Sequence, residues 1–270
     1  MKIGAGYHKI TSSLLAISLM TASVSQASWL GRVFDSEGSG HTKEEVEKAK
    51  AKTPKPVSYP VEAFKESDFT DKPWMKDFRY VIVINKAQKG KTAQRIRVYE
   101  NGYALNLGKD SQGNDASKVS TGRETFEMES AWIWNHGPDN GSYWSITPTG
   151  YYTPEWLNKD HRSSSWDTDM PYAVFFDTKN GIAMHEVPPK GFLGLGTRRS
   201  GGCIRLHPET AQNLFERIEK TRGSAVPVIG RDGKPELDSN GKVVYRNYGF
   251  LNGQKIGAYS ALIIVQDIQD

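Results

Sequence analysis

Apolar positions along the chain recur mostly with the period of two that is typical of β-strands. A near-continuous apolar run covers residues 80–85, and residues 94–100 alternate polar with apolar positions. The pair Asn101-Gly102 favours a tight hairpin, with a returning strand over residues 103–107. A second hairpin is predicted at Asn180-Gly181 and a terminal one over residues 239–245. Further strands are predicted over 119–121, 150–153, 173–177, 181–185, 226–229 and 261–265. The pattern therefore predicts a mainly β, mostly antiparallel core.

One stretch has the spacing of an amphipathic helix. Pro208 suits its first turn, Gly223 ends it, and apolar residues recur at three- and four-residue steps between them (Ala211, Leu214, Phe215 and Ile218). A short charged run over residues 41–52 is a second, solvated candidate. Two long segments, 124–145 and 155–171, lack clear periodicity and carry tryptophans and histidines: Trp132, Trp134, His136, Trp144, Trp156, His161 and Trp166. We interpret them equally as binding lids or as loops whose indoles pack onto the domain.

The chain divides into four parts. Residues 1–27 carry Lys2 and Lys9, no acidic residue, an apolar run and the small-x-small end Ser25-Gln26-Ala27, which predicts a cleaved export signal. Residues 28–78 form an N-terminal extension, and Pro54, Pro56 and Pro60 break up its second half. It is either a strap over the domain or a weakly ordered leader, and we favour the leader. Residues 79–230 form the domain, and 231–270 a C-terminal β extension.

Composition excludes some classes of partner. The formal charge of +4 falls to about +2 when the two lysines of the signal are removed, which is too little to favour nucleic acid. The apolar run of the signal is too short to span a membrane comfortably, so we expect no membrane span after its cleavage. We expect an exported protein of the periplasm or cell envelope.

Cys203, the only cysteine, is the strongest candidate for chemistry. A lone cysteine is usually a small buried core residue. An exported protein normally pairs its cysteines, however, so one unpaired thiol outside the cytoplasm favours a catalytic use. Glycines before it, Gly201 and Gly202, allow a tight turn with exposed N–H groups, and Arg205 adds a fixed positive charge. His185 ends a predicted strand, and we expect it to reach the same edge of the sheet.

These residues form a pattern that resembles the YkuD-type catalytic domain of bacterial L,D-transpeptidases, from about residue 80 to 229. The landmarks occur in order: Asn101-Gly102, Ser120-Thr121-Gly122, Thr147-Pro148-Thr149-Gly150, His185 and Ser200-Gly201-Gly202-Cys203-Ile204-Arg205-Leu206. The eighteen-residue step from His185 to Cys203 is also similar to the family's spacing.

The resemblance implies a YkuD-like β-sandwich catalytic domain with one helix after the catalytic cysteine. It implies a cysteine enzyme that acts on peptidoglycan stem tetrapeptides through an acyl-enzyme, without metal or cofactor. Cys203 corresponds to the nucleophile and His185 to the base. The N–H groups of Gly202 and Cys203 correspond to the oxyanion hole, and Arg205 and Ser200 to substrate-binding positions. The acceptor is another stem peptide or a wall-attached protein.

The chain departs from the family at Gly201, where the usual residue is histidine. We expect glycine there to open room beside the thiol, so that water competes better with an amine acceptor. An L,D-carboxypeptidase that trims tetrapeptides to tripeptides is therefore the alternative enzyme. A non-catalytic peptidoglycan-binding module is the alternative from another class, and retention of both His185 and Cys203 argues against it.

Overall fold

The computed structural model describes residues 42–128, 142–164 and 166–270. The predicted signal and the first part of the extension lie outside the described residues. The chain divides into residues 1–42 and the compact unit 43–270, and only the second is described here. Its helices are α2 (Lys43–Lys52), α3 (Asp68–Asp71) and α4 (Pro208–Glu219), with 3-10 turns at Pro73–Asp77, Thr178–Asn180 and Pro189–Gly194.

Most strands in the described residues belong to two sheets. The first has the order β3-β2-β1-β16-β7: Tyr103–Leu105, Arg95–Glu100, Tyr80–Asn85, Ala261–Gln266 and Gly150–Tyr152. The second has the order β15-β14-β8-β9-β10-β11-β4: Gln254–Ile256, Gly249–Leu251, Trp156–Ser163, Thr168–Asp177, Ile182–Glu186, Ile204–Leu206 and Val119–Ser120. Two short pairs join β5 to β6 and β12 to β13: Phe126–Met128 with Ser142–Trp144, and Val226–Pro227 with Tyr245–Arg246.

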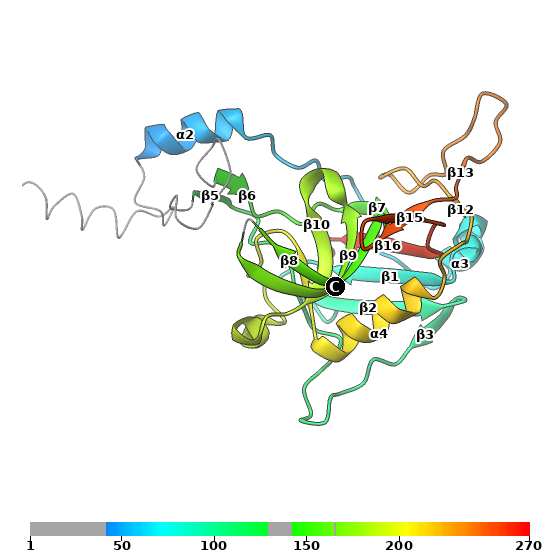
Figure 1. The fold of residues 1–270 in the computed structure, drawn as a ribbon, viewed down its shortest axis with the longest axis horizontal. Coiled ribbons are helices and arrows are strands. Elements are labelled where there is room, and N and C mark those ends of the chain that lie inside the picture. Colours follow the sequence, from blue (N-terminus) through cyan, green and yellow to red (C-terminus); the bar gives the residue numbers. More distant parts are fainter. Residues whose placement is uncertain (1–41, 129–141, 165) are drawn as a thin grey trace, which may run out of the picture. The chain divides into compact units, whose positions relative to one another are not determined.

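The main core is formed by the inner faces of both sheets together with α4. Ile82 of β1 and Ile263 of β16 belong to the same buried cluster as Met184 of β10 and Leu214 of α4. Figure 1 shows α4 lying alongside the strands that it covers. This is the predicted mainly β sandwich, with one helix following the cysteine segment.

The first sheet is buried on both faces, which explains why its central strands are apolar at nearly every position. The alternate residues Val83 and Ile264 face a second cluster that contains Phe64, Met75 and Phe78 from the N-terminal segment. Residues 61–78 thus cover the outer face of the sheet.

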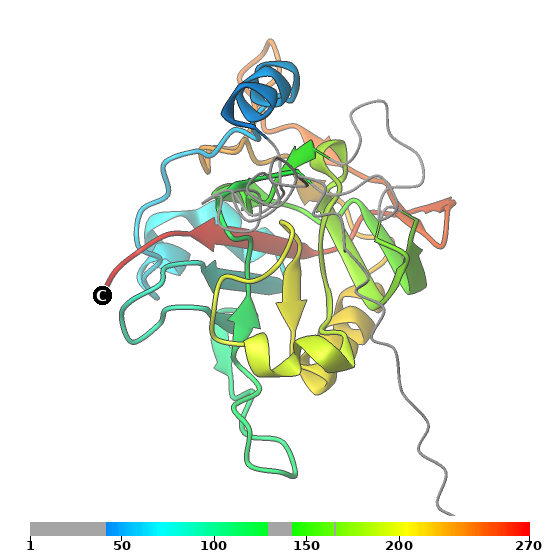
Figure 2. The same cartoon turned by 90° about the vertical axis from the view of Figure 1, so that its left-hand side faces the viewer.

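The last strand, β16, lies inside the first sheet and not beside it. It pairs in parallel with β1 and antiparallel with β7, as the red arrow in Figure 2 shows. We expected residues 231–270 to form an extension outside the domain. Instead, β16 in this segment is a central strand of the first sheet. Sequence periodicity identified the strand and carried no information on its neighbours.

One other expectation changes at this level and one is confirmed. The aperiodic segment 155–171 is largely strand: β8 pairs with β9 from Trp156 to Ser163. Exposed polar side chains on β8 conceal its alternation. The hairpin at residues 101–102 is confirmed, because Asn101 and Gly102 both have the positive φ that this tight turn requires.

Ile263, at the centre of β16, tests whether the C-terminal strand belongs to the core. Ile263→Ala should lower the free energy of unfolding by about 2–5 kcal/mol, because the side chain is fully buried between the sheets. Denaturant unfolding measures it, and Val243→Ala, on a partly exposed position of the same C-terminal region, is the control. Equal stability of the two variants would show that β16 is not part of the core.

Candidate active site

The pairing of β10 with β11 brings the predicted catalytic residues to one face of the second sheet. The strands are parallel, with Met184 opposite Ile204 and His185 opposite Arg205. Residues opposite each other point to the same face, and so do residues two apart. Cys203 directly precedes β11 and stands two residues before Arg205, so it shares the face of His185.

That face opens into a cavity of about 650 Å³, lined by His185, Cys203 and Arg205 among others. The alternate residues Met184 and Ile204 point the other way, into the core under α4. The apolar residues of the two strands therefore anchor the site from below. The structure brings together the nucleophile, base and arginine that the sequence predicted.

The turn before Cys203 is held by its own serine. The Ser200 hydroxyl accepts a hydrogen bond from the Gly202 N–H at 3.1 Å and donates one to the Cys203 carbonyl. The Ser200 N–H also donates to the Thr121 carbonyl at 3.0 Å. Ser200 also lines the cavity, so the substrate contact that we expected of it stays a prediction beside this supporting role. Its hydroxyl also engages the Gly202 N–H inside the turn, which leaves the Cys203 N–H as the better oxyanion candidate.

Gly202 is required at its position. Its φ is +132°, and an added Cβ would lie 3.0 Å from Ile182 Cδ1 and 3.1 Å from the Ile146 carbonyl oxygen. The Thr147 hydroxyl donates to the Gly202 carbonyl at 2.6 Å and accepts from the Gly122 N–H at 2.9 Å. The Ser-Thr-Gly and Thr-Pro-Thr-Gly landmarks therefore support the nucleophile turn, a role that the sequence did not indicate.

His185 is oriented to act as a base. Its Nδ1 lies 2.6 Å from the Glu186 carbonyl oxygen. Since a carbonyl only accepts, Nδ1 carries the proton and Nε2 keeps its lone pair. Burial lowers the pKa of His185 to about 4, the charges of Arg205 and His161 act in the same direction, and the hydrogen bond to Glu186 opposes them. The imidazole is therefore neutral at neutral pH.

The thiol of Cys203 is protonated when the site is empty. Burial raises its pKa, and a backbone hydrogen bond from Ala183 and the charge of Arg205 only partly oppose this. Its sulfur also lies 3.5 Å from the Gly181 carbonyl oxygen, an acceptor for the S–H. A neutral thiol and a neutral imidazole that line one cavity favour proton transfer during attack over a preformed thiolate.

Arg205 adds a positive charge to the cavity. Its strongest described contact is long, 3.5 Å from Nη1 to the Arg199 carbonyl oxygen. Burial and the charge of Arg123 lower its pKa, against the opposing effects of Cys203 and Tyr143, but a guanidinium stays protonated. In the described part of the chain it has no carboxylate partner within 4.0 Å. A bound carboxylate would supply one.

Gly201, the departure from the family pattern, is covered by an indole. An added Cβ at Gly201 would lie 2.8 Å from Trp166 Cζ2 and 3.2 Å from its Cη2. The expected room beside the thiol is therefore filled, because Trp166 reaches it from the turn between β8 and β9. Trp166 packs edge-on against Tyr143, with ring centroids 5.0 Å apart. Sequence spacing could not connect position 201 with a hairpin 35 residues earlier.

Arg123 and Tyr143 complete this wall of the cavity and were missed by the sequence analysis. Arg123 donates to the Tyr143 hydroxyl at 2.8 Å and forms an ion pair with Glu127 at 2.7 Å. Tyr143 lies in the segment 124–145 and Arg123 directly precedes it. This segment lacks a periodic pattern, so nothing in the sequence was a reason to select either residue. The wall thus combines aromatic surface with a second guanidinium.

The N-terminal segment reaches the same cavity. Thr53, Pro54 and Pro56 line it, and the Trp144 indole donates to the Thr53 carbonyl at 3.0 Å. Lys55 lies over the Trp144 ring, 5.2 Å from its centroid. This arrangement corresponds to the strap that we considered and did not favour.

The other histidines and tryptophans fall into different groups. His207 stands at the N-cap position of α4 and is buried, with Nε2 3.1 Å from an Asp110 oxygen. His161 lines the cavity and packs edge-on against Trp156. Trp144, Trp156 and Trp166 line the cavity as well. Trp132, Trp134 and His136 lie outside the described residues.

Comparison with known proteins identifies the class. The family model of the YkuD L,D-transpeptidase catalytic domain matches residues 79–234, more than half of the chain. The chain therefore belongs to this family. A comparison with curated proteins gave no significant match.

Solved structures that the comparison matched to this chain include L,D-transpeptidases. One from Mycobacterium tuberculosis H37Rv is 17% identical with a TM-score of 0.39, over 70% of this chain and 58% of that one. One from Xylanimonas cellulosilytica is 16% identical with a TM-score of 0.36, over 69% and 59%. L,D-transpeptidase 3 from M. tuberculosis, solved with a faropenem-derived adduct, is 17% identical with a TM-score of 0.39, over 70% and 61%. The chain thus spans about three fifths of these proteins.

The pH at which the rate falls on the acidic side tests the lowered pKa of His185. Because its pKa is lowered, the base form is present above about pH 4 and is lost as the pH falls through that value. The rate of Cys203 acylation should therefore decline near pH 4, well below the 6.5 of an ordinary imidazole. Intact-mass kinetics across the pH range measure it, with circular dichroism at each pH as the control for folding. A fall of the rate near pH 6.5 would contradict this assignment.

The effects of substitutions at Gly201 and Trp166 on stability and on acylation should be coupled. Gly201→His forces its side chain into the indole, so we expect a loss of about 1–3 kcal/mol in unfolding free energy and slower acylation. Trp166→Ala in the same chain should restore part of both, because it empties the occupied volume. Denaturant unfolding and acylation rates of the two single variants and the double variant measure this coupling. Strict additivity would disprove it.

Proposed function

We propose that the protein is a peptidoglycan L,D-transpeptidase that works through an acyl-enzyme on Cys203. The observation that carries the proposal is the convergence of His185 and Cys203 in one cavity, with the imidazole held in the tautomer that leaves Nε2 free. Membership of the family supports peptidoglycan peptides as the substrate class, and we propose stem tetrapeptides among them. Retention of both groups in this geometry favours an enzyme over a non-catalytic binding module.

In the proposed acylation, the Cys203 sulfur attacks the carbonyl carbon before the terminal D-residue. His185 Nε2 takes the thiol proton as the sulfur–carbon bond forms. The carbonyl oxygen becomes an anion that the Cys203 N–H is placed to stabilise. The carbon–nitrogen bond then breaks, and His185 returns the proton to the leaving amine. A thioester remains on Cys203.

Release follows the same path in reverse. An acceptor amine from another stem peptide or a wall-attached protein attacks the thioester, and His185 accepts the amine's proton and returns it to the sulfur. Water as acceptor would instead give the carboxypeptidase product. The indole of Trp166 fills the space through which we expected easier access of water, so transfer is the reaction that we propose.

Arg205 is proposed to hold an acidic group of the stem peptide. A guanidinium that faces the cavity without a carboxylate partner in the described residues supports this role. Its fork geometry suits a carboxylate better than an ammonium would.

The proposal places the protein outside the cytoplasm, in the periplasm or cell envelope, where the cross-linked wall lies. The predicted export signal supports this location. Among residues 42–128, 142–164 and 166–270, no helix is long and apolar enough to cross a membrane.

Cys203→Ala tests the nucleophile. It should abolish release of the terminal D-residue from a tetrapeptide muropeptide and leave thermal unfolding nearly unchanged, because it removes one sulfur atom. Mass spectrometry of the products measures turnover and distinguishes cross-linked dimers from trimmed tripeptides. A carbapenem should add once to the wild-type chain and not to the variant. Measurable product from the Ala variant would sink the assignment.

A further inference from the structure

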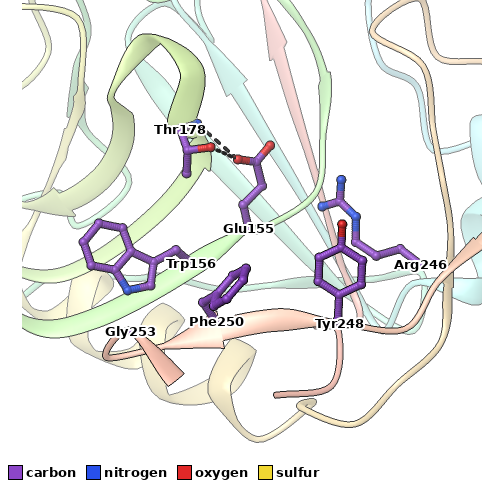
Figure 3. Close-up of a pocket in the computed structure, with 7 residues that line it drawn as sticks. All are labelled: Glu155, Trp156, Thr178, Arg246, Tyr248, Phe250 and Gly253. Atoms are coloured by element: carbon purple, nitrogen blue, oxygen red, sulfur yellow. Dashed lines mark hydrogen bonds between the residues drawn. The ribbon is translucent and has the colours of Figure 1, made fainter. Parts of the chain in front are cut away.

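A second pocket, of about 400 Å³, adjoins the active-site cavity at the other end of the sheet. Trp156 and Phe250 lie opposite each other on the parallel strands β8 and β14, so their side chains share a face. Tyr248 precedes them at the rim, and Gly253 closes the end. Figure 3 shows the three rings in a row, with the charged groups of the pocket along one side.

The rings at this rim are available to a ligand. Tyr248 is 46% exposed and Phe250 is 38% exposed, and the two rings pack edge-on with centroids 6.3 Å apart. Trp156 forms the inner end of the row and stacks on Phe175 at 4.5 Å, which fixes its ring plane. Exposed aromatic rings on a rigid strand pair provide flat apolar surface at little cost in conformational entropy.

Polar groups of both signs surround the rings. Glu155 Oε2 accepts hydrogen bonds from the Thr178 N–H and hydroxyl, and Arg246 Nη1 donates to the Thr153 hydroxyl at 3.1 Å. These contacts fix both side chains without pairing either with an opposite charge. The Trp156 Nε1–H is buried and has no acceptor among the described residues. A buried donor without a partner is costly, and an oxygen of a ligand or water would satisfy it.

This combination suits a pyranose ring with an acetamido group. The C–H face of a sugar packs on aromatic rings, while its hydroxyl groups donate to a carboxylate and its acetamido oxygen accepts from a guanidinium or an indole N–H. A purely apolar peptide side chain would leave Glu155 and Arg246 unused. A single anion would pair with Arg246 and leave Glu155 without a donor.

The distance to the nucleophile also fits. Trp156 and Thr178 line both the pocket and the active-site cavity, so the two are contiguous. Strands β8, β9, β10 and β11 are neighbours, which places the pocket three strand spacings, roughly 14 Å, from the start of β11. Four extended residue lengths span at most about 14 Å. A lactyl-linked tripeptide can therefore connect a sugar in the pocket with a carbonyl at Cys203.

We infer that the pocket of Trp156, Tyr248 and Phe250 is a glycan subsite that binds the N-acetylated sugar carrying the donor stem peptide. This inference rests on the proposed function for its choice of sugar. The subsite holds the glycan strand while the stem peptide reaches along the sheet to Cys203. It is built by β14 and the residues before it, in the segment between β12 and β16.

Binding of a sugar without peptide tests the subsite independently of catalysis. The full chain carrying Cys203→Ala is titrated calorimetrically with the disaccharide N-acetylglucosaminyl-N-acetylmuramic acid. We expect saturable binding that weakens about tenfold in Tyr248→Ala, through loss of one stacking surface, and is retained in Tyr248→Phe. Phe250→Ala is a second variant with the same expected loss. Tyr103→Ala, at a tyrosine 80% exposed on the other sheet, is the matched control.

Kinetics with and without the sugar give the second readout. Tyr248→Ala should raise the KM for a disaccharide-tetrapeptide about tenfold and leave the KM for the free tetrapeptide unchanged. No disaccharide binding, equal binding by Tyr248→Ala and the parent chain, or displacement of the disaccharide by free tetrapeptide would each overturn the subsite. Disaccharide binding without any turnover by the wild-type chain would instead refute the proposed function and leave the subsite standing.

Discussion

The parallel pairing of β10 with β11 is the constraint on which the site depends. One register, with His185 opposite Arg205, sends the base, the nucleophile and the cation to one face and the apolar residues to the other. A shift by one residue would bury Cys203 and Arg205 and expose Ile204. The cost of exposing the apolar residues therefore enforces the catalytic geometry. Burial also keeps the imidazole neutral and the thiol protonated, so the proposed acylation would begin from two uncharged groups.

The first sheet supports this site from a distance. Lys86 follows β1 and is almost fully buried, where its ammonium bonds Glu124 at 2.9 Å and the Thr147 carbonyl at 2.8 Å. Thr147 in turn holds the Gly202 carbonyl, so a buried ion pair connects the central sheet with the nucleophile turn. A buried charge is tolerated when it is paired and fully hydrogen-bonded, and it then specifies one arrangement of the segments that it joins. The N-terminal segment, which covers the outer face of this sheet, and β16, which pairs with β1 inside it, thus support the position of Lys86.

At position 201 glycine replaces the family's usual histidine, and a side chain from a distant hairpin fills the volume beside it. The glycine removes a side chain, and Trp166 occupies the volume that it leaves. The wall beside the thiol is therefore aromatic, continued by Tyr143 and supported by Arg123. The proposed reaction keeps its base, because His185 is held in the tautomer that leaves Nε2 free. The departure from the family motif thus changes the surface offered to the substrate more than it changes the acid–base groups.

The sequence by itself determined most strands of the first sheet and the helix after the cysteine, because periodicity and local turn chemistry are properties of neighbouring residues. The candidate site residues Cys203, His185 and Arg205 came from the order of motifs that resembles the family. The sequence did not reveal that β16 completes the first sheet or that residues 61–78 cover it, since strand order depends on contacts between distant segments. The exposed polar side chains of β8 concealed the alternation of this strand in the sequence. The turn of the same hairpin places Trp166 over the site. The supporting role of Ser200 and the filled space at Gly201 are decided by atoms from other elements. Only the tertiary structure could place those atoms.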